Sequence, residues 1–259
     1  MKPLCKWHGG KRTEIKIFKE FYPNSYTTYI EPFVGGGATY FDLNFEGNNV
    51  INDIHPELIN FYDMIKLGNG QDIFNKTISW GVTESDYYKV RTYQPTDNVE
   101  KAAKFYYLRK TCFRGMLRYN SKGEFNIPWG KYKNVDFTDI VDEKYVKLLE
   151  RTEIYCKSYK EIFKNYNSPD NFVFLDPPYD SEFSNYGYDD FTRNSQIELS
   201  EIFKSTKNKC MLIISETPLI EELYSDYIRY KYPKKYAFKL YYGRIGDEIN
   251  KNHLIITNY

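Results

Sequence analysis

Asp176, Pro177, Pro178 and Tyr179 follow a short apolar run and place a carboxylate and an aromatic ring beside two prolines. The apolar run, residues 172–175, is typical of a buried strand, and the prolines stop it abruptly. Asp176 is therefore predicted at the carboxyl end of a strand, the edge where open α/β sheets place their ligands. A carboxylate there accepts hydrogen bonds and a ring stacks on a planar ligand, although a capping Asp before a Pro-Pro turn also explains this segment taken alone.

The segment Thr-Tyr-Ile-Glu-Pro-Phe-Val-Gly-Gly-Gly-Ala at residues 28–38 predicts a strand, a glycine turn and then a helix. Glycines such as Gly35 and Gly37 let a cofactor lie against the turn and the helix N-terminus. The spacing differs from the Gly-x-Gly-x-x-Gly pattern of dinucleotide sites, because Thr39 and Tyr40 follow the glycines. A smaller adenosyl ligand is therefore favoured over a nicotinamide or flavin cofactor.

Asp53 ends a second predicted strand, residues 49–54, where an acidic side chain suits the ribose hydroxyls of a nucleoside cofactor. A cap for the helix that begins near Pro56 is the alternative role for this carboxylate. Trp7 and Lys11 flank a glycine pair at residues 9–10 that allows backbone to approach a ligand closely. A core aromatic and a solvated charge are the alternatives for these two side chains.

A local cluster of positive charge lies in residues 100–135, although the whole chain carries a net charge of only +1. Nine Lys or Arg residues stand against Glu100 and Glu124, a balance of +9 − 2 = +7. Aromatic residues are interleaved with them, and this mixture suits contact with phosphates and bases. A β-hairpin with a turn at residues 121–123 and solvated charges is the alternative, and it is compatible with a DNA contact.

The chain shows strand-like patterns at residues 28–31, 49–54, 153–156, 172–175, 210–215, 236–242 and 254–257. Helical patterns lie between them at residues 159–166 and 219–227. Between residues 67 and 145 the strand pattern disappears, and a helix is expected to start at Asn98 as its N-cap. Ser195 and Glu198 are expected to form a capping box for a further helix. The four cysteines are too far apart for a metal site or a redox motif, and no apolar run reaches membrane-spanning length, so a cytoplasmic protein without a metal is predicted.

Taken in order, five motifs resemble those of the Dam family of DNA adenine-N6 methyltransferases. They are residues 6–11 (Lys-Trp-His-Gly-Gly-Lys), 31–38, 52–54 (Asn-Asp-Ile), 118–132 (Arg-Tyr-Asn-Ser-Lys-Gly-Glu-Phe-Asn-Ile-Pro-Trp-Gly-Lys-Tyr) and 176–179. The resemblance runs from about residue 4 to residue 259. It implies an α/β, Rossmann-like S-adenosylmethionine-dependent methyltransferase fold with a mixed, mostly parallel sheet and a mainly helical recognition insertion that carries a β-hairpin. Residues 1–62 and 150–259 would form the catalytic domain and residues 63–149 the target-recognition insertion.

The resemblance also implies residue roles. The catalytic residues would be Asp176, Pro177, Pro178 and Tyr179. The S-adenosylmethionine site would comprise Trp7, Lys11, Phe33, Gly35, Gly37, Asp53 and Asp176. The DNA-binding residues would be Lys6, Phe113, Arg114, Arg118, Asn120, Pro128, Lys131 and Tyr132. The chain departs from the family pattern at Arg114, and at Asn252-His253, where the family commonly has an acidic pair.

The expected function is site-specific methylation of the N6 amine of a flipped-out adenine in duplex DNA, at GATC or a related GAT-containing site. Cytosine-N4 methylation is an alternative, although those enzymes more often carry Ser at the position of Asp176. A non-catalytic DNA-binding module with a methylase-like fold is another alternative. Expected partners are double-stranded DNA and, in a restriction-modification setting, a cognate restriction endonuclease. A monomer or weak dimer in the cytoplasm of a bacterial or phage-infected cell is expected, without membrane association.

Overall fold

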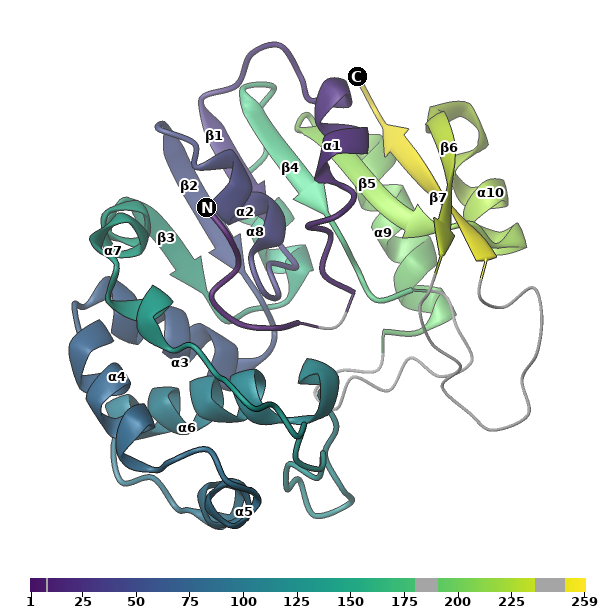
Figure 1. Cartoon of the computed structure of the whole chain (residues 1–259). Helices are drawn as coiled ribbons and strands as arrows, with labels where there is room; N and C mark the ends of the chain where they lie inside the picture. The colour runs from purple at the N-terminus through teal and green to yellow at the C-terminus, as the bar shows by residue number, and fades with distance from the viewer. Residues whose placement is uncertain (8, 180–190, 236–249) are drawn as a thin grey trace.

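One sheet organises the chain, and its strand order is β3-β2-β1-β4-β5-β7-β6 (Figure 1). The structure is a computed structural model that describes residues 1–7, 9–179, 191–235 and 250–259. The strands are Thr28–Glu31 (β1), Asn48–Asn52 (β2), Thr152–Tyr155 (β3), Asn171–Leu175 (β4), Lys209–Ser215 (β5), Ile228–Lys235 (β6) and Asn250–Thr257 (β7). Neighbouring strands are parallel from β3 to β5, whereas β7 is antiparallel to both β5 and β6. The predicted α/β fold with a mixed, mostly parallel sheet is confirmed.

Helices cover both faces of this sheet. They are Ile15–Phe18 (α1), Ala38–Leu43 (α2), Pro56–Lys66 (α3), Gly70–Ser79 (α4), Glu84–Thr92 (α5), Asn98–Thr111 (α6), Glu143–Glu150 (α7), Tyr159–Asn165 (α8), Arg193–Ser205 (α9) and Pro218–Tyr224 (α10). Short 3₁₀ turns occupy Lys19–Phe21, Phe113–Gly115, Thr138–Val141 and Ser225–Tyr227. No helix within the described ranges is long and apolar enough to cross a membrane.

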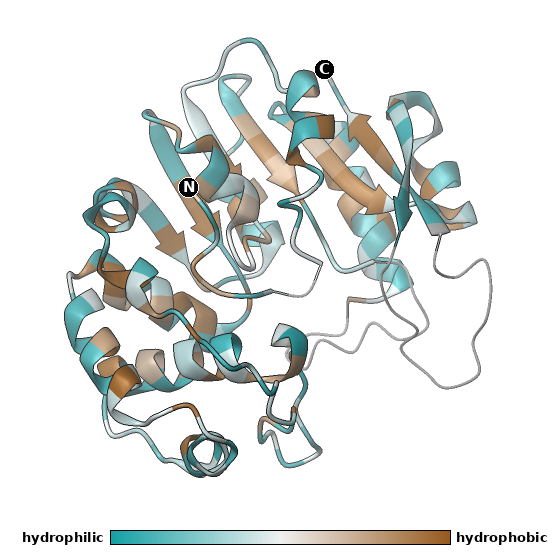
Figure 2. Cartoon of the chain, viewed as in Figure 1, coloured by the Kyte–Doolittle hydropathy of each residue, from teal (hydrophilic) through white to brown (hydrophobic). Residues whose placement is uncertain are grey.

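Successive side chains of the central strands point to opposite faces of the sheet and so contribute to two hydrophobic cores. Phe172 and Phe174 of β4 pack on the face covered by α1, α2 and α3, whereas Val173 and Leu175 pack on the face covered by α8, α9 and α10. Because both faces are covered, the central strands are apolar along most of their length (Figure 2). Burial of each such large apolar side chain stabilises the fold by about 1.5–3 kcal/mol. This rigid layer holds the ends of β1 and β4 in fixed positions.

The order of the strands reverses between β1 and β4. The chain leaves β1 for β2 on one side, whereas β4 leads to β5 on the other. The crevice at the carboxyl ends of such a pair is the ligand-binding place of open α/β sheets. The glycine turn follows β1 and the segment from Asp176 to Tyr179 follows β4, so two distant motifs meet at this switch point.

The chain between β2 and β3 forms a helical insertion, in which α6 packs against α3 and α4. Its helices α4, α5 and α6 lie beyond the carboxyl ends of the strands (Figure 1). The mainly helical character predicted for this region is confirmed. Among the described residues, the predicted hairpin is present only as two isolated antiparallel bridges, Cys112 with Trp129 and Tyr119 with Phe125. The residues next to these bridges do not pair, so no continuous strands form. Its turn is correct, and Gly123 at its end has a φ of 75°.

Several local predictions are wrong. Helix α6 begins at Asn98, but Asp97 caps it by accepting a hydrogen bond from the amide of Glu100 at 2.8 Å. The capping box of α9 pairs Thr192 with Ser195 and does not pair Ser195 with Glu198. Helix α10 ends at residue 224 and a 3₁₀ turn follows it. Strand β6 was not expected, and the strand predicted at residues 236–242 lies outside the described residues.

Candidate functional site

Lys11 is the centre of a cluster at the switch point. Its ammonium group lies 2.5 Å from Asp176 Oδ1, 2.6 Å from the Tyr179 hydroxyl and 3.0 Å from the Gly9 carbonyl. Only 1% of the Lys11 side chain is exposed, against 23% of the Asp176 side chain. Burial raises the pKa of Asp176, and the charge and hydrogen bond of Lys11 oppose that shift. Lys11 therefore helps to hold a partly accessible carboxylate in its ionised form.

The segment after Asp176 is fixed from the other face of the sheet. Gln196 of α9, which is 1% exposed, donates from Nε2 to the Pro178 carbonyl at 2.7 Å. Within the described part of the chain, the Pro177 carbonyl and Asp176 Oδ2 receive no hydrogen bond. Two acceptors in this segment, which two prolines stiffen, therefore have no hydrogen-bond donor among the described residues.

Behind this cluster, Glu14 joins the start of α1 to the last two strands. Its carboxylate lies 2.7 Å from His253 Nδ1 and accepts hydrogen bonds from the Tyr232 hydroxyl at 2.8 Å and Lys234 Nζ at 2.6 Å. The His253 ring in turn meets the Tyr179 ring edge-on at a centroid distance of 5.5 Å. Sequence reasoning missed this network, because Glu14 and His253 are 239 positions apart. The departure noted at Asn252-His253 was the only signal for it.

We expect the Glu14 carboxylate to make folding sensitive to acid. Burial alone would raise the pKa of Glu14, but hydrogen bonds from His253 and Lys234 and the charge of Lys11 bring it down to about 2 from an ordinary 4.5. A lowered folded-state pKa adds stability that is fully present above pH 4.5 and is lost as the pH falls toward 2. At about 1.4 kcal/mol per pH unit, roughly 3 kcal/mol of the free energy of unfolding depends on this group.

Urea titrations between pH 2 and 7 measure this dependence. Glu14→Gln should reduce stability at pH 7 and flatten the acid slope, because the amide does not titrate. Glu20→Gln, an exposed carboxylate in the following turn, is the matched control and should retain the slope. Equal slopes in wild type and Glu14→Gln would show that other carboxylates govern acid unfolding.

The second group of predicted residues surrounds the glycine turn. Gly35, with a φ of 49°, donates its amide to Asp53 Oδ2 at 2.9 Å, and Asp53 Oδ1 accepts from the amide of His55 at 3.1 Å. A Cβ at Gly35 would lie 2.6 Å from Trp7 Cδ1, so the indole covers the turn closely. Gly37, with a φ of 68°, is the N-cap residue of α2. Trp7, Gly35, Gly37 and Asp53 are therefore brought together as predicted.

Burial sets the charge of Asp53. It raises the pKa of this carboxyl to about 6, and hydrogen bonds from the amides of Gly35, His55 and Ile54 limit the rise. The residue does not cap α3, since His55 accepts the hydrogen bond from Leu58 there. Phe33 lies on the opposite side of the turn, where its ring packs against Tyr159 at 5.3 Å.

A third group of predicted residues lies on the insertion. Lys6 Nζ stands 3.5 Å above the Tyr132 ring, and the Tyr132 hydroxyl accepts from the amide of Arg114 at 3.1 Å. Phe113 is 39% exposed, and its ring lies 4.8 Å from the Arg114 guanidinium. Arg114 and Lys131 are both exposed and both adopt positive φ, 55° and 56°. These two exposed basic side chains therefore belong to residues with a strained backbone conformation.

The remaining residues predicted to bind DNA lie in the turn that follows. Arg118 donates from Nε to Asn126 Oδ1 at 2.8 Å and keeps its side chain exposed. Asn120 accepts from the amides of Lys122 and Glu124, so its side chain also shapes the turn. Pro128 is exposed, and its carbonyl accepts the amide of Phe113 at 2.8 Å.

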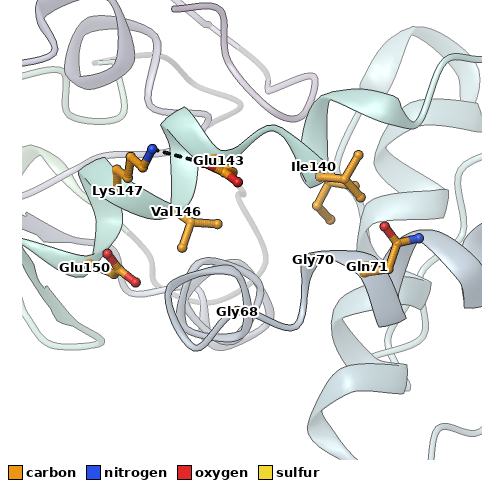
Figure 3. Close-up of a pocket in the computed structure, with 9 residues that line it drawn as sticks. Gly68, Gly70, Gln71, Ile140, Glu143, Val146, Lys147 and Glu150 are labelled. Carbon is orange, nitrogen blue, oxygen red and sulfur yellow. Dashed lines mark hydrogen bonds and ion pairs between the residues drawn. The ribbon is translucent and has the colours of Figure 1, made fainter.

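An open depression of about 370 Å³ lies between the α3–α4 connection and α7 (Figure 3). It is lined by Gly68, Gly70, Gln71, Ile140, Val141, Glu143, Val146, Lys147 and Glu150. None of the residues predicted to act chemically lines it, and its charged pair, Glu143 with Lys147, is highly exposed. The residues predicted to act chemically therefore lie at the switch point and not in this depression.

Comparison with known proteins agrees with this geometry. The family model described as "D12 class N6 adenine-specific DNA methyltransferase" matches residues 7–239. The sequence is 51% identical to the type II methyltransferase M.CviBI of Paramecium bursaria Chlorella virus NC1A over 261 residues, which cover 100% of both chains. It is 32% identical over 280 residues to the type II methyltransferase M1.LlaDCHI of Lactococcus lactis subsp. cremoris, covering 100% of this chain and 96% of the relative. It is also 32% identical over 214 residues to a DNA adenine methylase of Vibrio cholerae, covering 78% and 76%.

Proposed function

Because the chain belongs to the family of D12 class N6 adenine-specific DNA methyltransferases, we propose that it methylates a flipped-out adenine at a specific site in duplex DNA, with S-adenosylmethionine as the methyl donor. The observation that carries this proposal is a pair of acceptors, Asp176 Oδ2 and the Pro177 carbonyl, that have no donor among the described residues and lie in the segment bound by the buried Lys11. An adenine N6 amine has two hydrogens to donate, and the two acceptors match that number.

The acceptors change the reactivity of the amine. Its lone pair is delocalised into the ring, so it is a poor nucleophile until hydrogen bonds from both N–H groups hold it in a pyramidal geometry. Asp176 is also the group placed to take up the proton that the nitrogen loses. The Tyr179 ring would stack on the extruded base, since a base inside the duplex is out of reach. Cytosine-N4 methylation remains the alternative reaction, because the N4 amine of cytosine is also an exocyclic amine whose lone pair is delocalised into the ring.

The residues at the switch point fit S-adenosylmethionine. Asp53 retains acceptor capacity beyond the amides of Gly35, His55 and Ile54 and suits ribose hydroxyls, and the partly exposed Asp176 carboxylate suits a sulfonium cation. Trp7 and Phe33 offer ring surface on either side of Gly35 and Gly37. When bound, the cofactor supplies an electrophilic methyl group.

The insertion is proposed to read the DNA. Residues 63–149 form the target-recognition part, and residues 1–62 with 150–259 form the catalytic part. Phe113 would insert into the duplex, while Lys6, Arg114, Lys131 and Tyr132 would contact phosphates or base edges, as would Asn120 and Pro128 beside them. GATC or a related GAT-containing sequence is the proposed site.

We expect Arg118 to discriminate between bases. Its exposed guanidinium suits O6 and N7 of a guanine in the major groove, so Arg118→Ala should relax discrimination at that base by about 1–3 kcal/mol. The measurement is kcat/KM for a GATC duplex against duplexes with one base pair changed. Lys122→Ala, an exposed cation at the tip of the same turn, should leave the ratio unchanged. Weaker action on all duplexes alike would instead identify Arg118 as a phosphate contact.

The biological setting is proposed from the relatives. Two of them are named type II methyltransferases, which favours a restriction-modification role with a cognate endonuclease. The enzyme is expected to act as a monomer or weak dimer in the cytoplasm of a bacterial or phage-infected cell, where unmethylated DNA is found. A catalytically silent DNA-binding module is the second candidate function.

One experiment separates these functions. The protein is incubated with unmethylated duplex DNA and S-adenosylmethionine labelled in its methyl group, and the DNA is then digested to nucleosides. Label in N6-methyl-2′-deoxyadenosine supports the proposal. Label in N4-methylcytosine overturns it in favour of the cytosine enzyme, and DNA binding without label indicates the silent module.

A further inference from the structure

Arg109 of α6 is a buried cation that the proposed chemistry does not use. It is 1% exposed and is among the largest fully buried side chains of the described chain. Nη2 and Nε donate to the Lys6 carbonyl at 2.8 and 3.2 Å, Nη1 donates to the Met116 carbonyl at 2.7 Å, and Nη2 also donates to the Gly115 carbonyl. The guanidinium centre lies 5.2 Å from the Trp7 ring.

The partners of Arg109 are backbone carbonyls, and no carboxylate of the described residues forms an ion pair with it. A buried cation is costly, and an apolar side chain of similar volume often stabilises a fold as well or better. The positive charge is felt nearby, because it adds to burial in lowering the pKa of His55 to about 3. Stability alone therefore does not explain a guanidinium at this position.

The three carbonyls belong to two segments with different proposed tasks. One segment carries Lys6, which faces Tyr132 on the insertion, and Trp7, which covers Gly35 at the glycine turn. The other segment contains Gly115 and Met116 and directly follows Phe113 and Arg114. The Arg109 guanidinium thus links the Lys6 carbonyl, near the glycine turn, to the Gly115 and Met116 carbonyls, near the proposed recognition residues.

The contact between these segments is tight. Gly115 has a φ of 65°, and a Cβ at this position would lie only 2.4 Å from Lys6 Cβ. A shift of Lys6 and Trp7 therefore displaces the turn at Gly115 unless the hydrogen bonds of Arg109 break. Packed elements of this kind transmit small displacements because they do not deform continuously.

We propose that Arg109 is a positioning residue that couples cofactor binding at the glycine turn to DNA recognition by the Phe113–Met116 segment; this rests on the proposed function. A ligand that orders Trp7 against the turn would fix Lys6 and, through Arg109, the recognition segment. By linkage, DNA then tightens cofactor binding by the same factor as the cofactor tightens DNA binding.

The coupling factor is measured as the ratio of DNA Kd values without and with S-adenosylhomocysteine, which cannot donate a methyl group. For wild type we expect a factor in the range of about 5–150. Arg109→Lys keeps the charge but cannot reach three carbonyls, and Arg109→Met fills the space without donors, so both should lower the factor at least about threefold. Arg91→Lys is the matched control, because among the described residues Arg91 donates to one carbonyl, that of Ile127 at 3.3 Å, and should retain the factor. A purely structural role would lower thermal stability and leave the ratio unchanged.

A second measurement needs no variant. S-adenosylhomocysteine alone, without DNA, should slow amide hydrogen exchange in residues 113–118 of the wild-type protein. A wild-type coupling factor in the Arg109 variants, or unchanged exchange in that segment, overturns the inference while leaving the proposed function intact. Wild type that neither binds S-adenosylhomocysteine nor methylates DNA would instead overturn the proposed function itself.

Discussion

Asp176→Ala is expected to reduce methyl transfer by on the order of 10³-fold or more and to leave DNA binding largely intact. The substitution removes one of the two proposed acceptors for the adenine amine and the group that would take its proton, and loss of a single preorganised group alone costs about 10²–10³-fold. Single-turnover rates and duplex Kd values measure the two effects separately. Comparable losses in binding and rate would assign Asp176 a structural role.

Two further variants serve as comparisons for Asp176→Ala. Asp176→Asn keeps the shape but removes the charge that faces Lys11 Nζ at 2.5 Å, so it should also be inactive. Asp170→Ala changes an exposed carboxylate just before the same strand and should behave as wild type. The raised pKa of Asp176 means that its ionised form is lost at a higher pH than for an ordinary Asp, so the rate should fall on the acid side.

Lys11→Met is the second substitution with a large expected effect. It leaves the Asp176 carboxylate without its buried cation, and breaking such a pair by removing one partner costs about 3–5 kcal/mol. The loss of Lys11 also raises the pKa of Asp176 further, because Lys11 provides the largest effects that oppose burial. We expect turnover to fall about 10²–10³-fold and the acid limb of the kcat profile to move to higher pH.

The free energy of unfolding of Lys11→Met should also depend on the titration of Asp176. In Lys11→Met the folded-state pKa of Asp176 lies above its unfolded value, so stability is present at low pH and is lost as the pH rises through that pKa. The difference in unfolding free energy from wild type should therefore shrink at low pH. Lys11→Met with Asp176→Asn should recover stability without activity, and Lys16→Met, an exposed site on α1, should do neither. A pH-independent deficit would mean that lost packing, and not the unpaired carboxylate, causes the effect.

The sequence was most informative where a motif sits at the end of a strand. The patterns before Asp176, Gly35 and Asp53 place these residues at one edge of the sheet, and the structure brings them there because parallel strands share that edge. Composition alone indicated the basic and aromatic insertion around Phe113. Of the residues given DNA-binding roles by resemblance, Lys6 alone comes from the N-terminal segment, and it contacts Tyr132 of the insertion.

What could not be predicted depends on contacts between distant residues. Arg109 bonds carbonyls whose positions no side-chain pattern reveals, and Gln196 reaches the Pro178 carbonyl from another element. The misplaced caps have a different cause, since an N-cap is decided by which neighbouring side chain reaches the free amide, and Asp97 does so in place of Asn98. Strand β6 was missed because Lys, Arg and Pro233 obscure its alternation, as is common for an edge strand.

The positive φ angles of Arg114 and Lys131 have a consequence for protein engineering. A left-handed backbone costs an ordinary residue about 1–2 kcal/mol that glycine does not pay. Libraries screened for heat resistance without DNA will therefore favour glycine at these two positions, and the survivors will lack two of the exposed cations on the insertion. If these cations contact DNA as proposed, thermostable variants of this enzyme have to be selected for DNA binding as well as for stability.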